Sequence, residues 1–311
     1  MKYQWIKKQR MAVGAFMILA GLIITASLLS EVFFSLRNIN NISRQAVALG
    51  IVCIGQTLVI LTGGIDLSVG SVISLTSCLA TGLMLGRDSL VLPVLALVLG
   101  CALLIGFCNG LVITKIGIPP LIVSLGMMEV IQGITLLYTD APYGEIGPSL
   151  GFWAWGKIAG IPFAILFFAG LFATGMVILH KTPLGRYIYA IGGNEETARL
   201  SGIKTDRVKI YTYMICSLTA ALTGLLLSSR MGMGDPIVGE PFTIDSLVPV
   251  LIGGTSLTGG KGGLLGTLGG IFVLATLNNV LNLLNVSGYW QWIVQGLIII
   301  VVVSFDLKEK M

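Results

Sequence analysis

Asp66 is the side chain best placed for proton chemistry in apolar surroundings. It lies between two long apolar segments, and an ionisable group at membrane depth is costly and often functional. A structural role competes with this one, because the Asp66 carboxylate can cap the helix that is expected to start near Ser68. The pattern favours the cap and leaves a role in a polar pathway, or in proton coupling, open.

Neutral amides form the second polar group. Asn109 lies in an apolar segment, and Asn278, Asn282 and Asn285 recur at i, i+4 and i+7, on one face of a helix. Such a face can hold neighbouring helices together through hydrogen bonds. It can equally line a route for an uncharged polyhydroxy solute, which needs donors and acceptors but no counter-charge. Both interpretations stand.

A short helix inside the polar stretch 181–209 has both ends marked. An asparagine can cap its first turn, two acids follow where the helix dipole favours negative charge, an arginine pairs at helical spacing, and a glycine can close it. These residues are Asn194, Glu195, Glu196, Arg199 and Gly202. A helix of two turns is not stable alone, so we predict that it leans on a separate protein.

A glycine-rich sequence occurs twice. Leu61–Gly70 aligns without gaps with Leu251–Gly260, and Ser68 faces Thr258. Chance is one explanation in a chain with 41 glycines. The other is two equivalent halves, each with a glycine turn near the inner membrane face. The candidate gate residues are Gly63, Gly64, Gly70, Gly253, Gly254 and Gly260.

Other chemistry is disfavoured. The five cysteines lie in apolar segments without metal-ligand or redox spacing, and His180 is the single histidine. Gly260-Lys261 resembles the end of a phosphate-binding loop, but Thr255 and Gly262 replace the required glycine and hydroxyl. We predict no catalytic residue, no metal and no cofactor.

Composition indicates a polytopic membrane protein. Of the 311 residues, 55% are hydrophobic and only 11% charged, and the mean hydropathy is +0.94. A soluble domain carries about 25% charged residues. The net charge of +5 is no sign of nucleic-acid binding, because the basic residues cluster at the ends of apolar segments, where they fix orientation.

Ten apolar segments predict an all-α protein with ten transmembrane helices in one domain over residues 1–311. The first runs over 11–29 and is too long for a signal-peptide core. The others cover about 46–62, 70–86, 91–113, 119–138, 158–179, 208–229, 246–257, 263–285 and 289–305. The segment 246–257 is short and contains Pro249, which suggests a broken or re-entrant helix.

The basic residues orient these segments. With a cytoplasmic N-terminus, 14 of the 19 Lys and Arg residues fall on the inner side. Both termini and the stretch 181–209 are then cytoplasmic.

Four stretches resemble the membrane permease of the ribose-type monosaccharide ABC importers. They are 64–71, 109–126, 185–203 and 253–262, and the resemblance extends over nearly the whole chain. One departure is Thr243–Pro249, where relatives usually have alanine-rich sequence without proline.

The resemblance implies an ABC importer permease fold in the inner membrane of a bacterium, multi-pass and surrounded by lipid. It also implies a second permease subunit, as a homodimer or a pseudo-symmetric pair, a cytoplasmic ATPase and an extracytoplasmic sugar-binding protein. The loop that matches Asn194–Gly202, including Ala198, is then the coupling helix seated in the ATPase. The sugar is a monosaccharide, with ribose the first choice.

A rival hypothesis is an ion-coupled secondary sugar transporter that works without an ATPase. Asp66 and Glu129 would then carry protons or sodium. This hypothesis gives no reason for a structured helix in a cytoplasmic loop.

Overall fold

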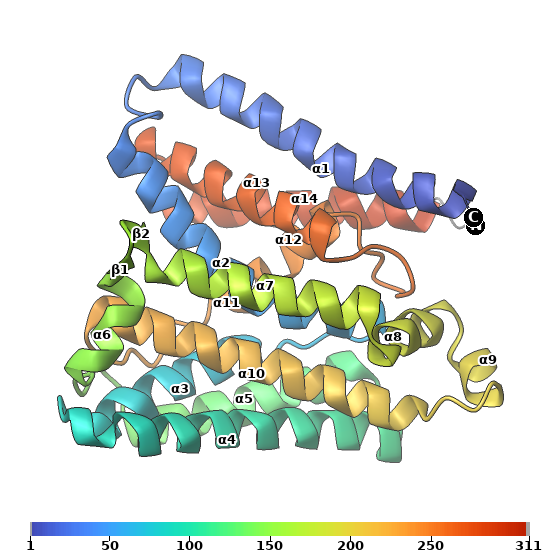
Figure 1. Ribbon diagram of the computed structural model, residues 1–311, viewed down its shortest axis with the longest axis horizontal. Helices are drawn as coiled ribbons and strands as arrows, with labels where there is room; N and C mark the ends of the chain where they lie inside the picture. Colours follow the sequence, from blue (N-terminus) through green and yellow to red (C-terminus); the bar gives the residue numbers. More distant parts are fainter. Residues whose placement is uncertain (1, 309–311) are drawn as a thin grey trace.

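A computed structural model describes residues 2–308 and consists almost entirely of helices (Figure 1). Its elements are α1 (Lys2–Leu29), α2 (Leu36–Leu61), α3 (Val69–Met84), the 3-10 turn η1 (Asp88–Leu90), α4 (Val91–Leu111), the π-helical turn η2 (Val112–Ile116), α5 (Pro120–Tyr138), α6 (Pro148–Trp155), β1 (Lys157–Ile158), β2 (Ile161–Pro162), α7 (Phe163–Lys181), α8 (Pro183–Gly193), α9 (Glu195–Leu200), α10 (Thr205–Met231), α11 (Phe242–Asp245), α12 (Leu247–Ile252), α13 (Leu264–Leu283) and α14 (Gly288–Lys308). The all-α prediction is confirmed apart from the two-residue strands of the β1–β2 hairpin.

Within the described residues, six helical runs are long and apolar enough to cross a membrane. They are α2, the run from η1 through η2, α5, α7, α10 and α13. Shorter apolar helices occupy Val13–Leu29, Val69–Met84 and Phe242–Ile252. Each of the ten predicted segments thus contains a helix, while the number of membrane crossings stays a prediction.

The segment predicted at 246–257 is a broken helix, as expected. Its helical part, α12, ends at Ile252, and its first five residues are buried among neighbouring helices. Gly254, with a φ of 80°, follows in a left-handed turn. The chain then reaches α13 through an irregular loop, in which Thr255 and Ser256 are buried and Thr258 and Lys261 are exposed.

The starts of two predicted spans, 158–179 and 46–62, were wrong. The predicted span 158–179 starts only at Phe163, because the residues before it form the β1–β2 hairpin, whose turn Ala159–Gly160 has positive φ at both positions. The predicted span 46–62 begins ten residues earlier, at Leu36, where the Ser35 side chain caps α2 by accepting a hydrogen bond from the backbone N–H of Asn38 at 3.2 Å.

The core lies around α2 and α10. In the most apolar stretch of each helix, 89% of the α2 residues and 67% of the α10 residues are buried, compared with 17% for α5 and 22% for α7. The peripheral helices therefore expose apolar side chains, which suits contact with hydrocarbon rather than water. Glycines let the inner helices approach closely. A Cβ on Gly270 of α13, for example, would lie 2.1 Å from the carbonyl oxygen of Pro249 in α12.

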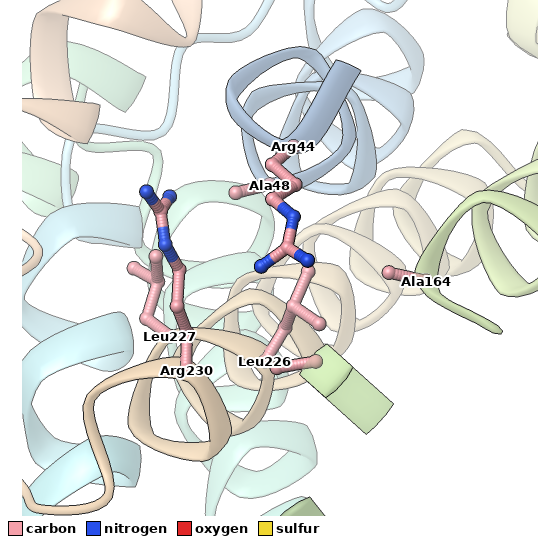
Figure 2. Close-up of a pocket in the computed structure, with 7 residues that line it drawn as sticks. Arg44, Ala48, Ala164, Leu226, Leu227 and Arg230 are labelled. Atoms are coloured by element: carbon pink, nitrogen blue, oxygen red, sulfur yellow. The ribbon is translucent and has the colours of Figure 1, made fainter. Parts of the chain in front are cut away.

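The two ends of the bundle differ. α8 and α9 lie at one end, where α1 starts and α14 finishes (Figure 1). α6 and the β1–β2 hairpin lie at the other end. A small cleft opens there between α2, α6, α7 and α10, with Arg44 and Arg230 on its walls (Figure 2).

Candidate coupling site

The α9 helix has the local geometry that its sequence predicts. The Asn194 side chain accepts a hydrogen bond from the backbone N–H of Thr197 at 2.8 Å, so it caps the first turn. Gly202 follows with a φ of 83°, the left-handed conformation expected of a terminating glycine. The role of this helix in coupling stays a prediction.

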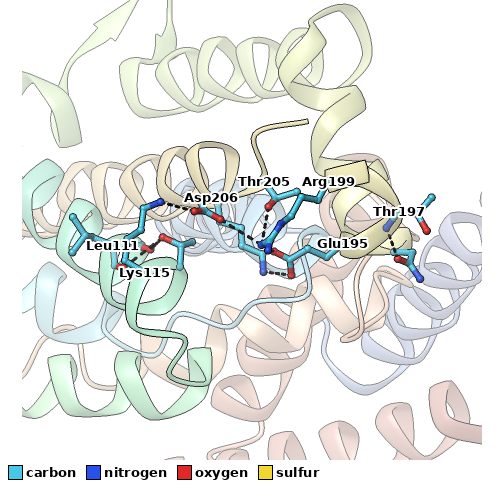
Figure 3. A network of polar contacts seen from close by, with 11 residues as sticks. Leu111, Lys115, Glu195, Thr197, Arg199, Thr205 and Asp206 are labelled. Atoms are coloured by element: carbon cyan, nitrogen blue, oxygen red, sulfur yellow. Dashed lines mark hydrogen bonds and ion pairs between the residues drawn. The ribbon is translucent and has the colours of Figure 1, made fainter. Parts of the chain in front are cut away.

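Ion pairs fasten α9 to two neighbouring elements (Figure 3). Glu195 pairs with Arg199 at 3.7 Å, as its spacing predicts, and also with Lys209 of α10. Arg199 in turn lies 3.6 Å from Asp206 of α10, and Asp206 pairs with Lys115 of η2 at 2.6 Å. Single exposed pairs contribute about 0–1 kcal/mol each. A connected set nevertheless holds α9 in one orientation against α10 and the end of α4.

The prediction that α9 leans on a separate protein needs a correction for one of its faces. Ala198 is only 4% exposed, and the helix packs there against α8 and α10 of the same chain. The opposite face is bare: Leu200 is 84% exposed, and Glu196 is exposed beside it. These two side chains make up the face of α9 that its own chain leaves uncovered.

A further helix, α8, precedes α9 and was missed in the sequence. The Thr182-Pro183 pair could have revealed it, since the Thr182 hydroxyl accepts from the N–H of Gly185 and Pro183 occupies the first turn. The end of α8 lies against both glycine turns. A Cβ on Gly192 would lie 1.9 Å from the Leu61 oxygen and 2.3 Å from the Gly260 nitrogen.

The two glycine turns also touch each other. The N–H of Gly260 donates to the carbonyl oxygen of Leu61 at 3.0 Å. Tyr189 of α8 donates from its hydroxyl to the Gly262 oxygen at 2.9 Å. We name the meeting point of Leu61, Gly192 and Gly260 the glycine junction. It joins the α2–α3 turn, the α12–α13 turn and the segment that leads directly into α9.

The alignment of the two turns needs adjustment. Gly63 (φ 78°) and Gly254 (φ 80°) are both left-handed and each lies two positions after the end of its helix, so these two match in the structure with a shift of one residue from the sequence alignment. Gly260 is left-handed as well, with a φ of 72°. Gly64 and Gly253 lie beside them within the turns. Gly70 is no turn residue: it lies in α3, where a Cβ would meet the hydroxyl of Thr243 at 2.1 Å.

Asp66 and Asn109 come together deep in the protein. Asp66 Oδ1 accepts from the backbone N–H of Ser68 at 3.0 Å and from its hydroxyl at 2.6 Å, while Asn109 donates to the same hydroxyl at 3.0 Å. The predicted cap contact is therefore present, although the helix itself begins after Ser68. All three side chains are fully buried. Their place in a pathway stays a prediction.

The amides of α13 lie elsewhere and contact α14. Asn278 accepts a hydrogen bond from Gln295 at 3.4 Å, and Asn282 accepts one from Gln291 at 2.9 Å. Asn285 lies just beyond the helix with a φ of 54°. The interhelical-packing interpretation thus has direct contacts in its favour, and the structure does not join this face to Asp66 and Asn109.

One buried amide pair was missed. Asn38 and Asn279 exchange two hydrogen bonds, at 2.9 and 2.7 Å, and both are about 5% exposed. These bonds connect α2 to α13. Asn38 escaped notice because the predicted span began after it.

A bundle of apolar helices with exposed apolar side chains on its periphery is the architecture of a multi-pass membrane protein. The chain belongs to the family described as the permease component of branched-chain amino acid transport systems, whose model matches residues 38–303.

Curated relatives agree with this family. The chain is 44% identical to the ribose import permease protein of Bacillus subtilis (strain 168) over 303 residues, which cover 96% of this chain and 93% of the relative. It is 38% identical to the ribose import permease protein of Escherichia coli (strain K12), with 98% and 95% coverage. The xylose transport system permease protein of Escherichia coli (strain K12) is 33% identical, with 89% and 86% coverage. No solved structure gives a significant match.

The glycine junction predicts a contrast between two adjacent substitutions. Gly192→Ala should lower the melting temperature of the purified protein, because overpacking at a filled site costs about 1–3 kcal/mol. Gly193→Ala is the matched control, because its Cβ would meet nothing within 4 Å. Thermal unfolding in one detergent measures both, and equal melting temperatures would show that the junction is not tightly packed.

The cap of α9 predicts a local change in hydrogen exchange. Asn194→Ala removes the acceptor for the Thr197 N–H and should weaken the first turn by about 1 kcal/mol, which is about fivefold faster amide exchange there. Asn194→Asp retains an acceptor and should keep the protection. Exchange followed by mass spectrometry on peptides of α9 reads both variants, and identical rates in all three proteins would contradict the cap.

Proposed function

We propose that this chain is the membrane subunit of an ATP-driven bacterial importer that carries a monosaccharide, with ribose as the preferred sugar. The observation that carries the proposal is the 44% identity, over 96% of the chain, to a ribose import permease. The relative named for xylose is more distant, at 33% identity. The chain itself is not an enzyme in this proposal, and a separate ATPase supplies the energy.

The proposed placement is the bacterial inner membrane, with ten spans in one domain and both termini in the cytoplasm. The position of 14 of the 19 Lys and Arg residues supports it. So does the bundle, in which α1 starts and α14 finishes at the end that carries α9 (Figure 1). The loop 181–209 is then cytoplasmic.

The ATPase is proposed to dock on the bare face of α9, over Leu200 and Glu196. The opposite face of α9, around Ala198, packs against the rest of the chain, and this is how docking can drive transport. Through its ion pairs α9 is tied to α10 and η2, and through α8 it leads to the glycine junction. A push on α9 therefore reaches both glycine turns by direct contact, without passing along a transmembrane helix.

Two further partners are proposed. A second copy of the chain completes the permease, and an extracytoplasmic sugar-binding protein delivers sugar at the end of the bundle opposite α9. We keep Asp66 and Asn109 as the proposed polar path, because both lie beside the α2–α3 turn that the junction controls. Asn278 and Asn282 are assigned to helix packing by their bonds to α14.

Uptake of labelled ribose by reconstituted vesicles tests the function. Accumulation should require ATP, the ATPase and the binding protein together, and unlabelled xylose should compete less well than unlabelled ribose. The control is the chain alone in a proton or sodium gradient. Accumulation there would refute the proposal in favour of the ion-coupled transporter that Asp66 would serve.

The docking face predicts a second result. Leu200→Asp should reduce copurification of the ATPase at least about tenfold, since charging an apolar interface residue costs more than 1.4 kcal/mol. It should leave the melting temperature of the chain unchanged, because Leu200 is 84% exposed. Leu85→Asp, at the opposite end and 46% exposed, is the control. Undiminished copurification with Leu200→Asp would place the ATPase elsewhere.

A further inference from the structure

Two arginines share one cleft at the end of the bundle opposite α9 (Figure 2). Arg44 comes from α2 and Arg230 from the last turn of α10. The cleft is shallow: the space inside it that can hold a water-sized sphere is only about 20 Å³. Its other lining residues are Ala48, Ala154, Ala164, Leu226 and Leu227, all small or apolar. The cleft therefore combines two positively charged side chains with an otherwise apolar lining.

Neither guanidinium is neutralised by an acid. The ion pairs among the described residues all lie around α9, and none includes Arg44 or Arg230. Arg44 instead lies over the Trp155 ring, with 4.3 Å between its guanidinium carbon and the ring centroid. This is a cation–π contact rather than a hydrogen bond, so it does not use up the N–H donors of the guanidinium.

The surroundings are those of a membrane interface. Trp155 is 57% exposed, and Ile158 and Ile161 on the neighbouring hairpin are 48% and 47% exposed. Tryptophan gathers where hydrocarbon meets lipid headgroups. The α7 wall of the cleft is Ala164, which is itself buried, but the apolar stretch of that helix is only 22% buried and so offers apolar surface next to the cleft.

We propose that this cleft binds the phosphodiester of a membrane phospholipid. Arg44 and Arg230 hold the phosphate oxygens, since the arginine fork matches phosphate geometry. The acyl chains run along the exposed apolar side chains beside the cleft, those of Trp155, Ile158 and Ile161, rather than into it. A free phosphate has the same charge as the headgroup but would leave these apolar side chains uncovered. The proposal requires only that the chain lies in a membrane, and so does not depend on the sugar or on the ATPase.

Native mass spectrometry of the delipidated protein tests the site. The probes are a phosphatidylglycerol, a diacylglycerol with the same chains but no phosphate, and inorganic phosphate. The wild type should retain phosphatidylglycerol and not the diacylglycerol, and millimolar phosphate should not displace the lipid. Arg44→Ala/Arg230→Ala should weaken retention about tenfold or more, as expected for lost charge-assisted bonds. Lys157→Ala, a cation at the same end on the exposed hairpin, should retain lipid normally.

A second variant keeps the test decisive if the double alanine protein is not monodisperse. Arg44→Lys/Arg230→Lys preserves the charge but lacks the fork, and should still bind the phospholipid several-fold more weakly than wild type. Equal retention by wild type and the double variants overturns the proposal. Displacement of the lipid by inorganic phosphate would identify a site for free anions and would also overturn the proposal. So would double variants that retain the lipid but no longer bind the sugar-binding protein, because they would identify a protein-docking site.

Discussion

The backbone contact at the glycine junction is the constraint on which the α9 end of the protein depends. Gly260 donates to the Leu61 oxygen at 3.0 Å, and Gly192 fits against both groups only because it has no Cβ. In apolar surroundings an unpaired carbonyl costs several kcal/mol, so the two turns satisfy each other. The end of α8 therefore cannot shift far without disturbing one turn or the other. Because α9 follows α8 directly, α9 is joined through α8 to both turns.

Charged side chains and neutral polar side chains occupy different parts of the protein. Acids and bases are paired around α9, where water is near and several weak bonds together fix one orientation. The protein interior holds mostly neutral polar groups, such as the reciprocal amide pair of Asn38 and Asn279, which needs no counter-ion, while the buried Asp66 is held by hydrogen bonds from Ser68. At the opposite end, Arg44 and Arg230 form no ion pair with any acid in the part of the chain that the structure describes, and unpaired arginines are far less costly at a membrane surface than within hydrocarbon.

Local features were predictable from the sequence, and so was most of the helical content. The Asn194 cap, the Gly202 terminus, the Glu195–Arg199 pair and the broken segment 246–257 all follow from residues close in the chain. Such signals act over one or two helical turns, so no knowledge of the fold is needed. The hairpin before α7 and the polar first turns of α2 were missed because apolar runs alone defined the spans.

The partners of each polar side chain were decided only by the tertiary structure. Nothing local shows that Glu195 also pairs with Lys209, that Asn278 bonds to Gln295, or that Gly70 serves packing instead of a turn. The glycine junction is the clearest case, since it brings together residues 61, 192 and 260. The sequence by itself determined an apolar helical protein with a capped polar helix, because hydropathy and capping are properties of neighbouring residues. Which backbone groups meet depends on how helices pack, and that is a property of the whole chain.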